Sequence, residues 1–323
     1  MSDNKLVVEG SNSNIPCRKL SLNEKKLKEA AKAYLALAPV MALIIIFYIL
    51  PIIINIMFSF TNYSVRNFKD YKFVGFDNYK YVFGQNLNGL TSLTLWTFIF
   101  AISVVLISFF VGTILAIILN DNGIKLRKFY RTIFIIPWVI PSVITLLMWR
   151  GLLNTNYGFI NKVLEAIGFN KIPWLSDPIM ARISIILIVV WFSFPFLSVI
   201  ALGLLQSIPR DLYESAQIDG STGYKSFTNI TLPCLLRGMT PVLILAFIMQ
   251  FNQFGVYIVT KGEPASKVIG DPGATDLLLT YVYNTAFRVF RYDLAATYSV
   301  VIFVFMAIFA LVNMKFSEKI SKE

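Results

Sequence analysis

Long apolar runs, separated by polar segments, organise this chain of 323 residues. Six of the runs approach or exceed the roughly 20 helical residues that cross a bilayer, and none of the six contains Asp, Glu, Lys or Arg. They lie at residues 34–60, 93–119, 132–149, 183–205, 238–260 and 294–314. Because a backbone in lipid must satisfy its own hydrogen bonds, all six are expected to be helices. The pattern predicts an all-α, polytopic integral membrane protein with six transmembrane helices.

The polar segments divide the chain into three regions. Residues 1–33 are expected to form a cytoplasmic, basic amphipathic segment. Its run SLNEKKLKEAAKAY, with Ser21 and Glu24 at the spacing of a capping box, is expected to be a helix at the membrane surface. Residues 34–316 form the predicted transmembrane domain, and residues 317–323 form a short tail. The N-terminal segment has no short apolar stretch followed by a small-residue cleavage site, so no cleaved signal peptide is expected.

Composition and charge agree with a lipid environment. The chain is 56% hydrophobic and 15% charged, whereas soluble domains carry about 25% charged residues. Its net charge of +11 is spread over many short loops, which argues against nucleic-acid binding. The densest basic clusters, Lys25–Lys32 and Lys125–Arg131, predict that both termini are cytoplasmic. Cys17 and Cys234 would then face a reducing compartment, so no disulfide is expected.

Several kinds of chemistry are disfavoured. The chain has no His, which removes Ser-His-Asp hydrolysis, His-ligated metals and the usual neutral-pH proton shuttle. The piece GSTGYKS at Gly220 lacks the glycine and lysine spacing of a phosphate loop. Because the spans carry no charge, ion-coupled transport is also disfavoured. We expect no catalytic residue, no metal site and no cofactor, and any energy for uphill transport must come from a partner.

The polar segment between the fourth and fifth spans, residues 207–233, predicts two short helices on the cytoplasmic face. Pro209 and Asp211 suit the start of the first helix, Gly220 is placed to end it, and Thr222 can cap the second. Small side chains on the first helix would let another surface approach closely. Apolar side chains that could fill a groove of a partner are Leu212, Tyr213, Ile218 and Phe227.

This segment resembles the EAA loop of importer-type ATP-binding-cassette permeases. The matching positions are Glu214, Ser215, Ala216, Gly220, Ile230, Leu232 and Pro233. The family has Ala where Ser215 stands, which is a small departure. The resemblance implies that this loop, with Leu212 and Tyr213, docks into a cleft of a cytoplasmic ATPase subunit. ATP-Mg would then be bound by the partner and not by this chain.

Further motifs resemble the first of the two permease subunits of maltose/maltodextrin importers. They are IIPWVIPS, WLSDP, WFSFPF, GLLQSIPRDLYESA, FNQFGVYIVTKGEP and GATDLLLTYVYNTAF. The match extends from Arg131 to the C-terminus, and the chain lacks the two extra N-terminal spans and the large external domain of some members. The resemblance implies a second permease subunit, two ATPase subunits, an external solute-binding protein and a location in the prokaryotic cytoplasmic membrane.

The spans that contain proline offer candidate solute contacts. Pro137 and Pro141 bracket the third span's WVI, and Pro195 interrupts the fourth span; proline bends a helix and is tolerated where a cavity or a partner satisfies the freed backbone group. Gln250 and Gln253 share one face of the fifth span. Uncharged amides and aromatic rings suit a neutral, polyhydroxylated solute.

The same resemblance implies which side chains line the solute cavity. They are Trp138, Ser142, Phe192, Ser193, Phe196, Ala246, Met249, Gln250 and Gln253. Trp138 and Phe196 replace Tyr of the maltose pattern, and the two glutamines replace Asn, so the cargo is either a maltodextrin-like oligosaccharide, a non-glucose oligosaccharide or another neutral solute. Each position could instead serve helix packing. A stand-alone channel or facilitator is a further alternative, although a channel needs no ATPase-docking helix.

Overall fold

The computed structural model describes residues 22–121, 123–264 and 271–320, which form helices and the connections between them. Over these ranges the only strand-like pairing is an isolated bridge between Thr61 and Phe73. In these ranges five helices are long and apolar enough to cross a membrane, and a bent helix pair is a sixth span if the pair counts as one. The predicted all-α, polytopic architecture is therefore confirmed, with five to six candidate spans. The chain separates into two units, residues 1–54 and 55–323.

The first unit is helical throughout its described part. It contains α1 (Leu22–Ile44), the π-helical turn η1 (Ile45–Ile49) and the beginning of α2 (Leu50–Ser59). The wide turn lies just before Pro51, which cannot donate to the carbonyl four residues earlier and therefore loosens the helix. Described side chains from residue 32 to residue 54 are exposed. Ser21 and Cys17 lie outside the described residues.

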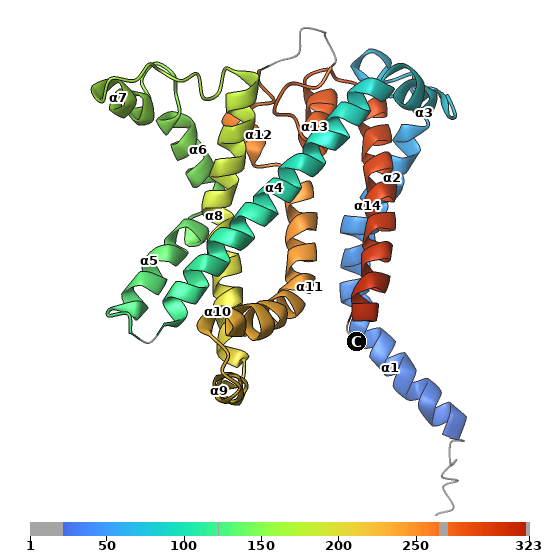
Figure 1. Ribbon diagram of the computed structural model, residues 1–323. Helices are drawn as coiled ribbons and strands as arrows, with labels where there is room; N and C mark the ends of the chain where they lie inside the picture. The colour runs from blue at the N-terminus through green and yellow to red at the C-terminus, as the bar shows by residue number, and fades with distance from the viewer. Residues whose placement is uncertain (1–21, 122, 265–270, 321–323) are drawn as a thin grey trace, which may run out of the picture. The chain divides into compact units, whose positions relative to one another are not determined.

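Two long helices form the centre of the second unit. α4 (Leu87–Asn120) crosses α8 (Pro178–Ser207), as Figure 1 shows. At Gly112 the backbones approach so closely that a Cβ atom would lie 2.9 Å from the carbonyl oxygen of Phe194 and 2.9 Å from the nitrogen of Ser198. Small residues allow such approach between membrane helices, so Gly112 determines how α4 packs on α8.

Proline has different effects in the third and fourth spans. The third span consists of α5 (Arg127–Val139) and α6 (Ser142–Leu152), bent by 89°. Ile140 is extended (φ −67°, ψ 131°) because a residue before proline avoids the helical region, and Pro141 then starts a new direction. The expectation of one helix over residues 132–149 is thus corrected. Pro195, expected to interrupt the fourth span, is buried inside the continuous helix α8.

The fifth span is also broken. Four residues separate the end of α11 (Leu232–Phe251) from the start of α12 (Val256–Thr260). The apolar pattern had predicted one continuous helix over residues 238–260. The side-chain oxygen of Gln253 accepts a hydrogen bond from the backbone N–H of Gly255 at 2.9 Å, which satisfies one group freed by the break. The sixth span is α14 (Tyr292–Ile320).

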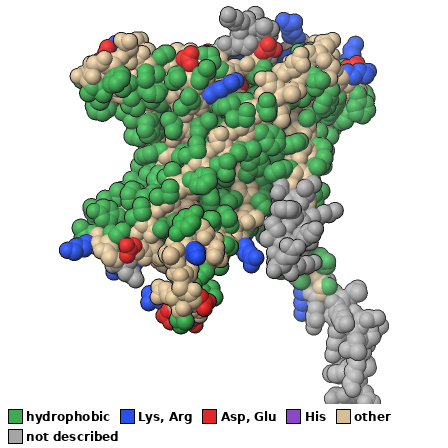
Figure 2. Space-filling view, in the orientation of Figure 1, with side chains coloured by type: hydrophobic (Ala, Val, Ile, Leu, Met, Phe, Trp, Pro, Cys, Tyr) green, Lys and Arg blue, Asp and Glu red, His purple; other side chains and the backbone are tan. Residues whose placement is uncertain are grey.

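Short elements gather at the two ends of the second unit. One end, called here the α7 end, carries α3, α7, α12 and α13, and the opposite end, called the α9 end, carries α9 and α10 (Figure 1). The short elements other than α12 are η2 (Val65–Asn67), α3 (Asp77–Lys80), η3 (Tyr81–Gln85), α7 (Phe159–Ala166), α9 (Arg210–Ile218), α10 (Gly223–Ser226), η4 (Phe227–Thr231) and α13 (Leu278–Phe287). Figure 2 shows hydrophobic side chains over the middle of the visible face and charged side chains toward the ends.

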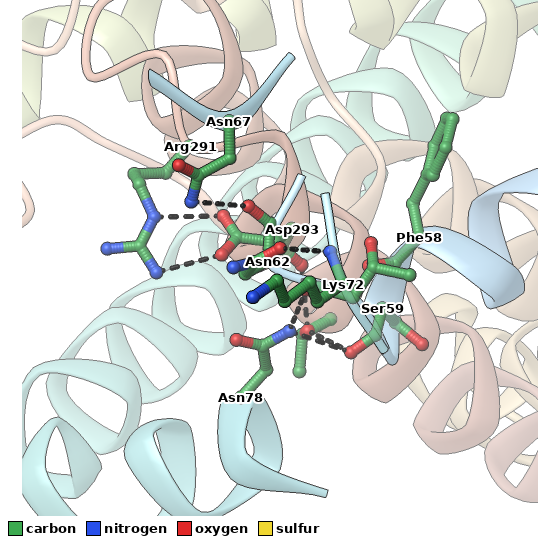
Figure 3. A network of polar contacts seen from close by, with 10 residues as sticks. Phe58, Ser59, Asn62, Asn67, Lys72, Asn78, Arg291 and Asp293 are labelled. Atoms are coloured by element: carbon green, nitrogen blue, oxygen red, sulfur yellow. Dashed lines mark hydrogen bonds and ion pairs between the residues drawn. The ribbon is translucent and has the colours of Figure 1, made fainter. Parts of the chain in front are cut away.

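A polar network at the α7 end ties the segment after α2 to the start of α14 (Figure 3). The amide of Asn78 donates to the backbone oxygens of Ser59 at 2.9 Å and Thr61 at 2.7 Å. Arg291 donates from Nε and Nη2 to the two carboxylate oxygens of Asp293, both at 2.9 Å. The Asp293 hydrogen bond raises the pKa of Arg291. Because Asp293 is buried, this bidentate pair holds the turn into α14 in one geometry.

Candidate solute cavity and coupling loop

A cavity of about 310 Å³ lies between four helices of the second unit. α4, α5, α8 and α11 supply its walls, together with the break that follows α11. Eight of the nine side chains that the sequence placed around a solute line this cavity. They are Trp138, Phe192, Ser193, Phe196, Ala246, Met249, Gln250 and Gln253. Residues from three separate spans therefore converge on one space.

The two glutamines form a chain of hydrogen bonds across the cavity wall. Gln253 donates from Nε2 to the side-chain oxygen of Gln250 at 3.4 Å, and Gln250 donates from Nε2 to the hydroxyl of Ser193 at 3.3 Å. Both bonds are longer than is usual for an N–H···O hydrogen bond. Each amide also keeps donor or acceptor capacity beyond these bonds. The wall can therefore exchange or add hydrogen bonds with hydroxyl groups of a solute.

Aromatic side chains form a second part of the wall. The rings of Trp138 on α5 and Phe196 on α8 have centroids 5.6 Å apart and are tilted by 37°. Trp138 is half-exposed, at 51%, so part of its indole is open to the cavity. Flat apolar rings beside amide groups match the mixed surface of a sugar, which has apolar ring faces and hydroxyl edges.

The sequence analysis missed one helix of the wall. Val104, Val105 and Ser108 of α4 line the cavity, as does Leu197 of α8. The Ser108 hydroxyl is buried and has no hydrogen-bond partner among the described residues. The sequence of α4 is almost uniformly apolar. No sequence signal therefore distinguishes the face of α4 that lines the cavity from the face that packs on other helices.

Ser142 is the one expected residue that does not line this cavity. It is the first residue of α6, beyond the 89° bend that turns the third span away.

The described residues around the cavity carry no formal charge. Among the described residues of the whole chain, no group of three or more His, Cys, Asp or Glu side chains is arranged to hold a metal ion. A charged solute would find no countercharge in this wall, and burying an unpaired ion is costly. The cavity is therefore chemically suited to a neutral polar solute.

The polar segment between α8 and α11 folds as two short helices, as the sequence predicted. Pro209 is the N-cap of α9, with Asp211 in the first turn. Gly220 ends the helix with φ +74°, a conformation that favours glycine. The Thr222 hydroxyl accepts from the backbone N–H of Lys225 at 3.4 Å and caps α10.

The side chains of this segment divide into two groups. Tyr213 is half-buried, and its hydroxyl lies 2.8 Å from the hydroxyl of Thr231. This contact packs α9 against η4, the segment that precedes α11. Ala216, Phe227, Ile230, Leu232 and Pro233 are also half-buried. By contrast, Leu212, Glu214 and Ser215 are exposed, and Ile218 is 87% exposed. The α9 end thus presents apolar side chains that the chain itself does not cover.

A buried carboxylate organises the loop before α13, and the sequence analysis did not identify it. Asp276 accepts hydrogen bonds from the backbone N–H of Gly273 at 2.9 Å, the hydroxyl of Thr280 at 3.0 Å and the amide of Asn284 at 3.0 Å. Burial raises the pKa of Asp276 above its ordinary value. Nearby, Arg182 donates to the backbone oxygen of Ala274 at 2.7 Å, which links this loop to α8.

A family model described as "Binding-protein-dependent transport system inner membrane component" matches residues 108–318. The matched region includes α5 to α13 and most of α14. It contains the candidate coupling loop and all of the cavity wall except Val104 and Val105.

Three relatives illustrate the sequence similarity. The maltose/maltodextrin transport system permease protein MalF of Vibrio vulnificus is 36% identical over 70% of this chain, but the chain spans only 44% of that relative's length. The galactooligosaccharides transport system permease protein GanP of Bacillus subtilis is 32% identical over 90% of this chain and 71% of its own length. The maltodextrin transport system permease protein MalC of Streptococcus pneumoniae is 31% identical over 98% of this chain and 76% of its own length.

Solved structures show a similar fold. A chain of a bacterial ABC transporter involved in the import of the acidic polysaccharide alginate superimposes with a TM-score of 0.68 and 26% sequence identity. The match covers 92% of this chain and 97% of the other. A structure of bacterial alginate ABC transporter in complex with an alginate pentasaccharide-bound periplasmic protein gives a TM-score of 0.69 and 25% identity.

Proposed function

Since the chain belongs to the family of binding-protein-dependent transport system inner membrane components, we propose that it is a permease subunit of an ATP-binding-cassette importer for a neutral oligosaccharide. The observation that carries the proposal is the uncharged cavity that Gln250, Gln253 and Ser193 line together with Trp138 and Phe196. Amides supply hydrogen bonds to sugar hydroxyls, and the rings cover the apolar faces of sugar units. The chain itself carries no catalytic residue in this proposal.

The cargo is of the maltodextrin kind in this proposal. Two of the three relatives named above are permeases for maltose or maltodextrin, and the third serves galactooligosaccharides. The alginate transporter handles an acidic polysaccharide, and such a cargo would be poorly matched by a wall without a cation. The galactooligosaccharide relative makes a non-glucose oligosaccharide the alternative cargo.

The energy enters through the loop of α9 and α10 in this proposal. Exposed Leu212 and Ile218 beside exposed Glu214 provide a surface for a cytoplasmic ATPase subunit. Tyr213 would pass the motion of α9 to α11, because its hydroxyl lies 2.8 Å from that of Thr231, next to the start of α11. ATP-Mg is bound by two such partner subunits, and a second permease subunit completes the membrane pore.

The proposed orientation places the α9 end in the cytoplasm and the α7 end outside. The segment Lys125–Arg131, which includes the beginning of α5, lies at the α9 end and carries one of the two densest basic clusters of the chain, which favours the cytoplasmic side. An external solute-binding protein would deliver the sugar at the α7 end, where α3, α7 and α13 gather.

Uptake in proteoliposomes tests the proposal. The chain is purified with its second permease and ATPase subunits, and the vesicles receive the external binding protein with radiolabelled maltotriose, a galactooligosaccharide or an alginate trisaccharide. We expect ATP-dependent uptake of maltotriose and little uptake of the acidic sugar. Uptake without ATP would support a facilitator instead, and uptake of the alginate trisaccharide alone would overturn the neutral-cargo assignment.

A further inference from the structure

A second, smaller cavity lies between the end of α4, α5 and α8. Its volume is about 160 Å³, and its walls are hydrocarbon apart from Arg131 and Ser198. The apolar wall includes Leu119, Phe134 and Leu202. A sugar would find almost no hydrogen-bond partners in this space, so it is not a continuation of the polar cavity.

The one charged group of this cavity is held in place by the end of α4. Arg131 donates from Nη2 to the backbone oxygen of Leu119 at 3.1 Å. Its Nε–H is buried and has no hydrogen-bond partner among the described residues. A buried donor without an acceptor is unfavourable, and the Arg131 side chain also lines the cavity. Arginine binds phosphate well because its planar guanidinium presents several donors at once.

The surroundings of Arg131 strengthen the positive potential. Lys125, Arg127 and Lys128 lie within six residues of it, and Asp121 is the nearest acidic residue in sequence. Neither Lys125, Lys128 nor Arg131 forms an ion pair with an acidic side chain in the described part of the chain. Figure 2 shows basic side chains at this corner of the α9 end.

One wall of the cavity reaches the surface of the protein. Val199 lines the cavity and is 44% exposed, so it lies at the surface of the helices, where acyl chains of the membrane would surround it. A ligand that places an anion on Arg131 and hydrocarbon against Phe134 and Leu202 is amphiphilic. Free phosphate would satisfy the guanidinium alone and leave the apolar space unfilled.

We propose that this cavity binds an anionic phospholipid of the cytoplasmic leaflet, with its phosphate on Arg131 and part of one acyl chain in the apolar space. Basic pockets between membrane helices recognise such headgroups. The proposal rests on the orientation given under the proposed function and not on the identity of the sugar. Arg131, Ile135 and Trp138 share one face of α5, so a bound lipid would also hold Trp138 in its place at the solute cavity.

Lipid retention tests the proposal. The full complex with its partner subunits is reconstituted into nanodiscs of dioleoyl-phosphatidylcholine with a minor fraction of dioleoyl-phosphatidylglycerol, extracted in mild detergent and analysed for bound lipid by mass spectrometry. We expect enrichment of phosphatidylglycerol in the wild-type complex. Arg131→Gln should lower that enrichment by about fivefold, the effect of one cation near a membrane anion. Lys128→Gln removes the same charge from the same helix, but Lys128 does not line the cavity, so enrichment should fall clearly less than in Arg131→Gln.

A second variant separates the acyl chain from the charge and guards against a folding defect in Arg131→Gln. Val199→Phe fills the cavity and leaves every charge in place, and the partial exposure of Val199 makes the substitution tolerable. Enrichment should be lost in this variant as well. Wild-type enrichment in Val199→Phe, an equal loss in Lys128→Gln, or complete displacement of the lipid by inorganic phosphate would each overturn the proposal.

Discussion

Gln250 on α11 donates its side-chain amide to the hydroxyl of Ser193 on α8 at 3.3 Å, and both side chains line the solute cavity. The contact joins two spans that are 57 residues apart in sequence. An amide on a membrane helix is costly unless it is paired. The long bond to Ser193 satisfies the Gln250 amide within the chain and leaves it available to a sugar hydroxyl.

Replacing Gln250 and Gln253 together with Leu should therefore abolish most sugar uptake without preventing assembly. Each lost hydrogen bond removes about 0.5–1.5 kcal/mol, so two lost bonds should lower uptake by about fivefold to 140-fold. Basal ATP hydrolysis should persist because the coupling loop is intact. Asn252→Leu is the matched control, since Asn252 lies between the two glutamines and does not line the cavity. Normal uptake by the double variant would identify the glutamines as packing residues.

Gly112→Ala should destabilise the contact between α4 and α8. The added Cβ would lie 2.9 Å from backbone atoms of α8, and backbone cannot move aside as a side chain can. The cost of such overpacking is about 1–3 kcal/mol, which should lower the thermal midpoint of the purified complex. Gly203→Ala on α8 is the control, because nothing lies within 4 Å of its added Cβ. Equal midpoints for the two variants would contradict the close approach.

Ile218→Asp should weaken binding of the ATPase subunit while leaving the fold unchanged. Ile218 is 87% exposed, so the charge costs little in the isolated chain, whereas it would be buried unpaired in an interface. A well-buried interface position contributes about 1–2 kcal/mol or more, so co-purified ATPase should fall by about tenfold. Tyr157→Asp, at the 68% exposed Tyr157 of the α7 end, should retain it. If the Ile218→Asp variant co-purifies with as much ATPase subunit as the wild type does, Ile218 is not part of the docking surface.

The loop around Asp276 should become more stable as pH falls. Burial raises the pKa of Asp276 in the folded chain, so the folded state holds the proton more tightly than the unfolded state. The stabilisation is complete below the ordinary pKa and is lost as pH rises through the raised value. Hydrogen exchange over residues 273–284, corrected for the intrinsic rate, should therefore slow on acidification. Asp276→Asn should flatten this dependence, and an unchanged slope in that variant would assign it to another group.

Labelling of single cysteines should establish the orientation. Cys17 and Cys234 are first replaced by Ser, because Cys234 is exposed and would react. Tyr224→Cys at the α9 end should then react with an impermeant maleimide only from the cytoplasm, and Ser176→Cys at the α7 end only from outside. Both positions are exposed. The reverse pattern would invert the proposed topology.

The sequence by itself determined the architecture and much of the chemistry. Apolar length specified the six spans, since a lipid-crossing segment must be both long and uncharged. Glycine and hydroxyl positions specified the ends of the short helices, as Gly220 and Thr222 illustrate. These features depend on local rules that need no partner from elsewhere in the chain.

Only the tertiary structure decided how the spans meet. The same residue type, proline, bends the third span at Pro141 and leaves α8 continuous at Pro195, because the outcome depends on what packs around the helix. The uniformly apolar run of α4 gives no sign that Ser108 would line the same cavity as Gln250. Asp276 is buried because Gly273, Thr280 and Asn284 converge on it, and that convergence depends on how the loop folds onto α13 rather than on any single local signal.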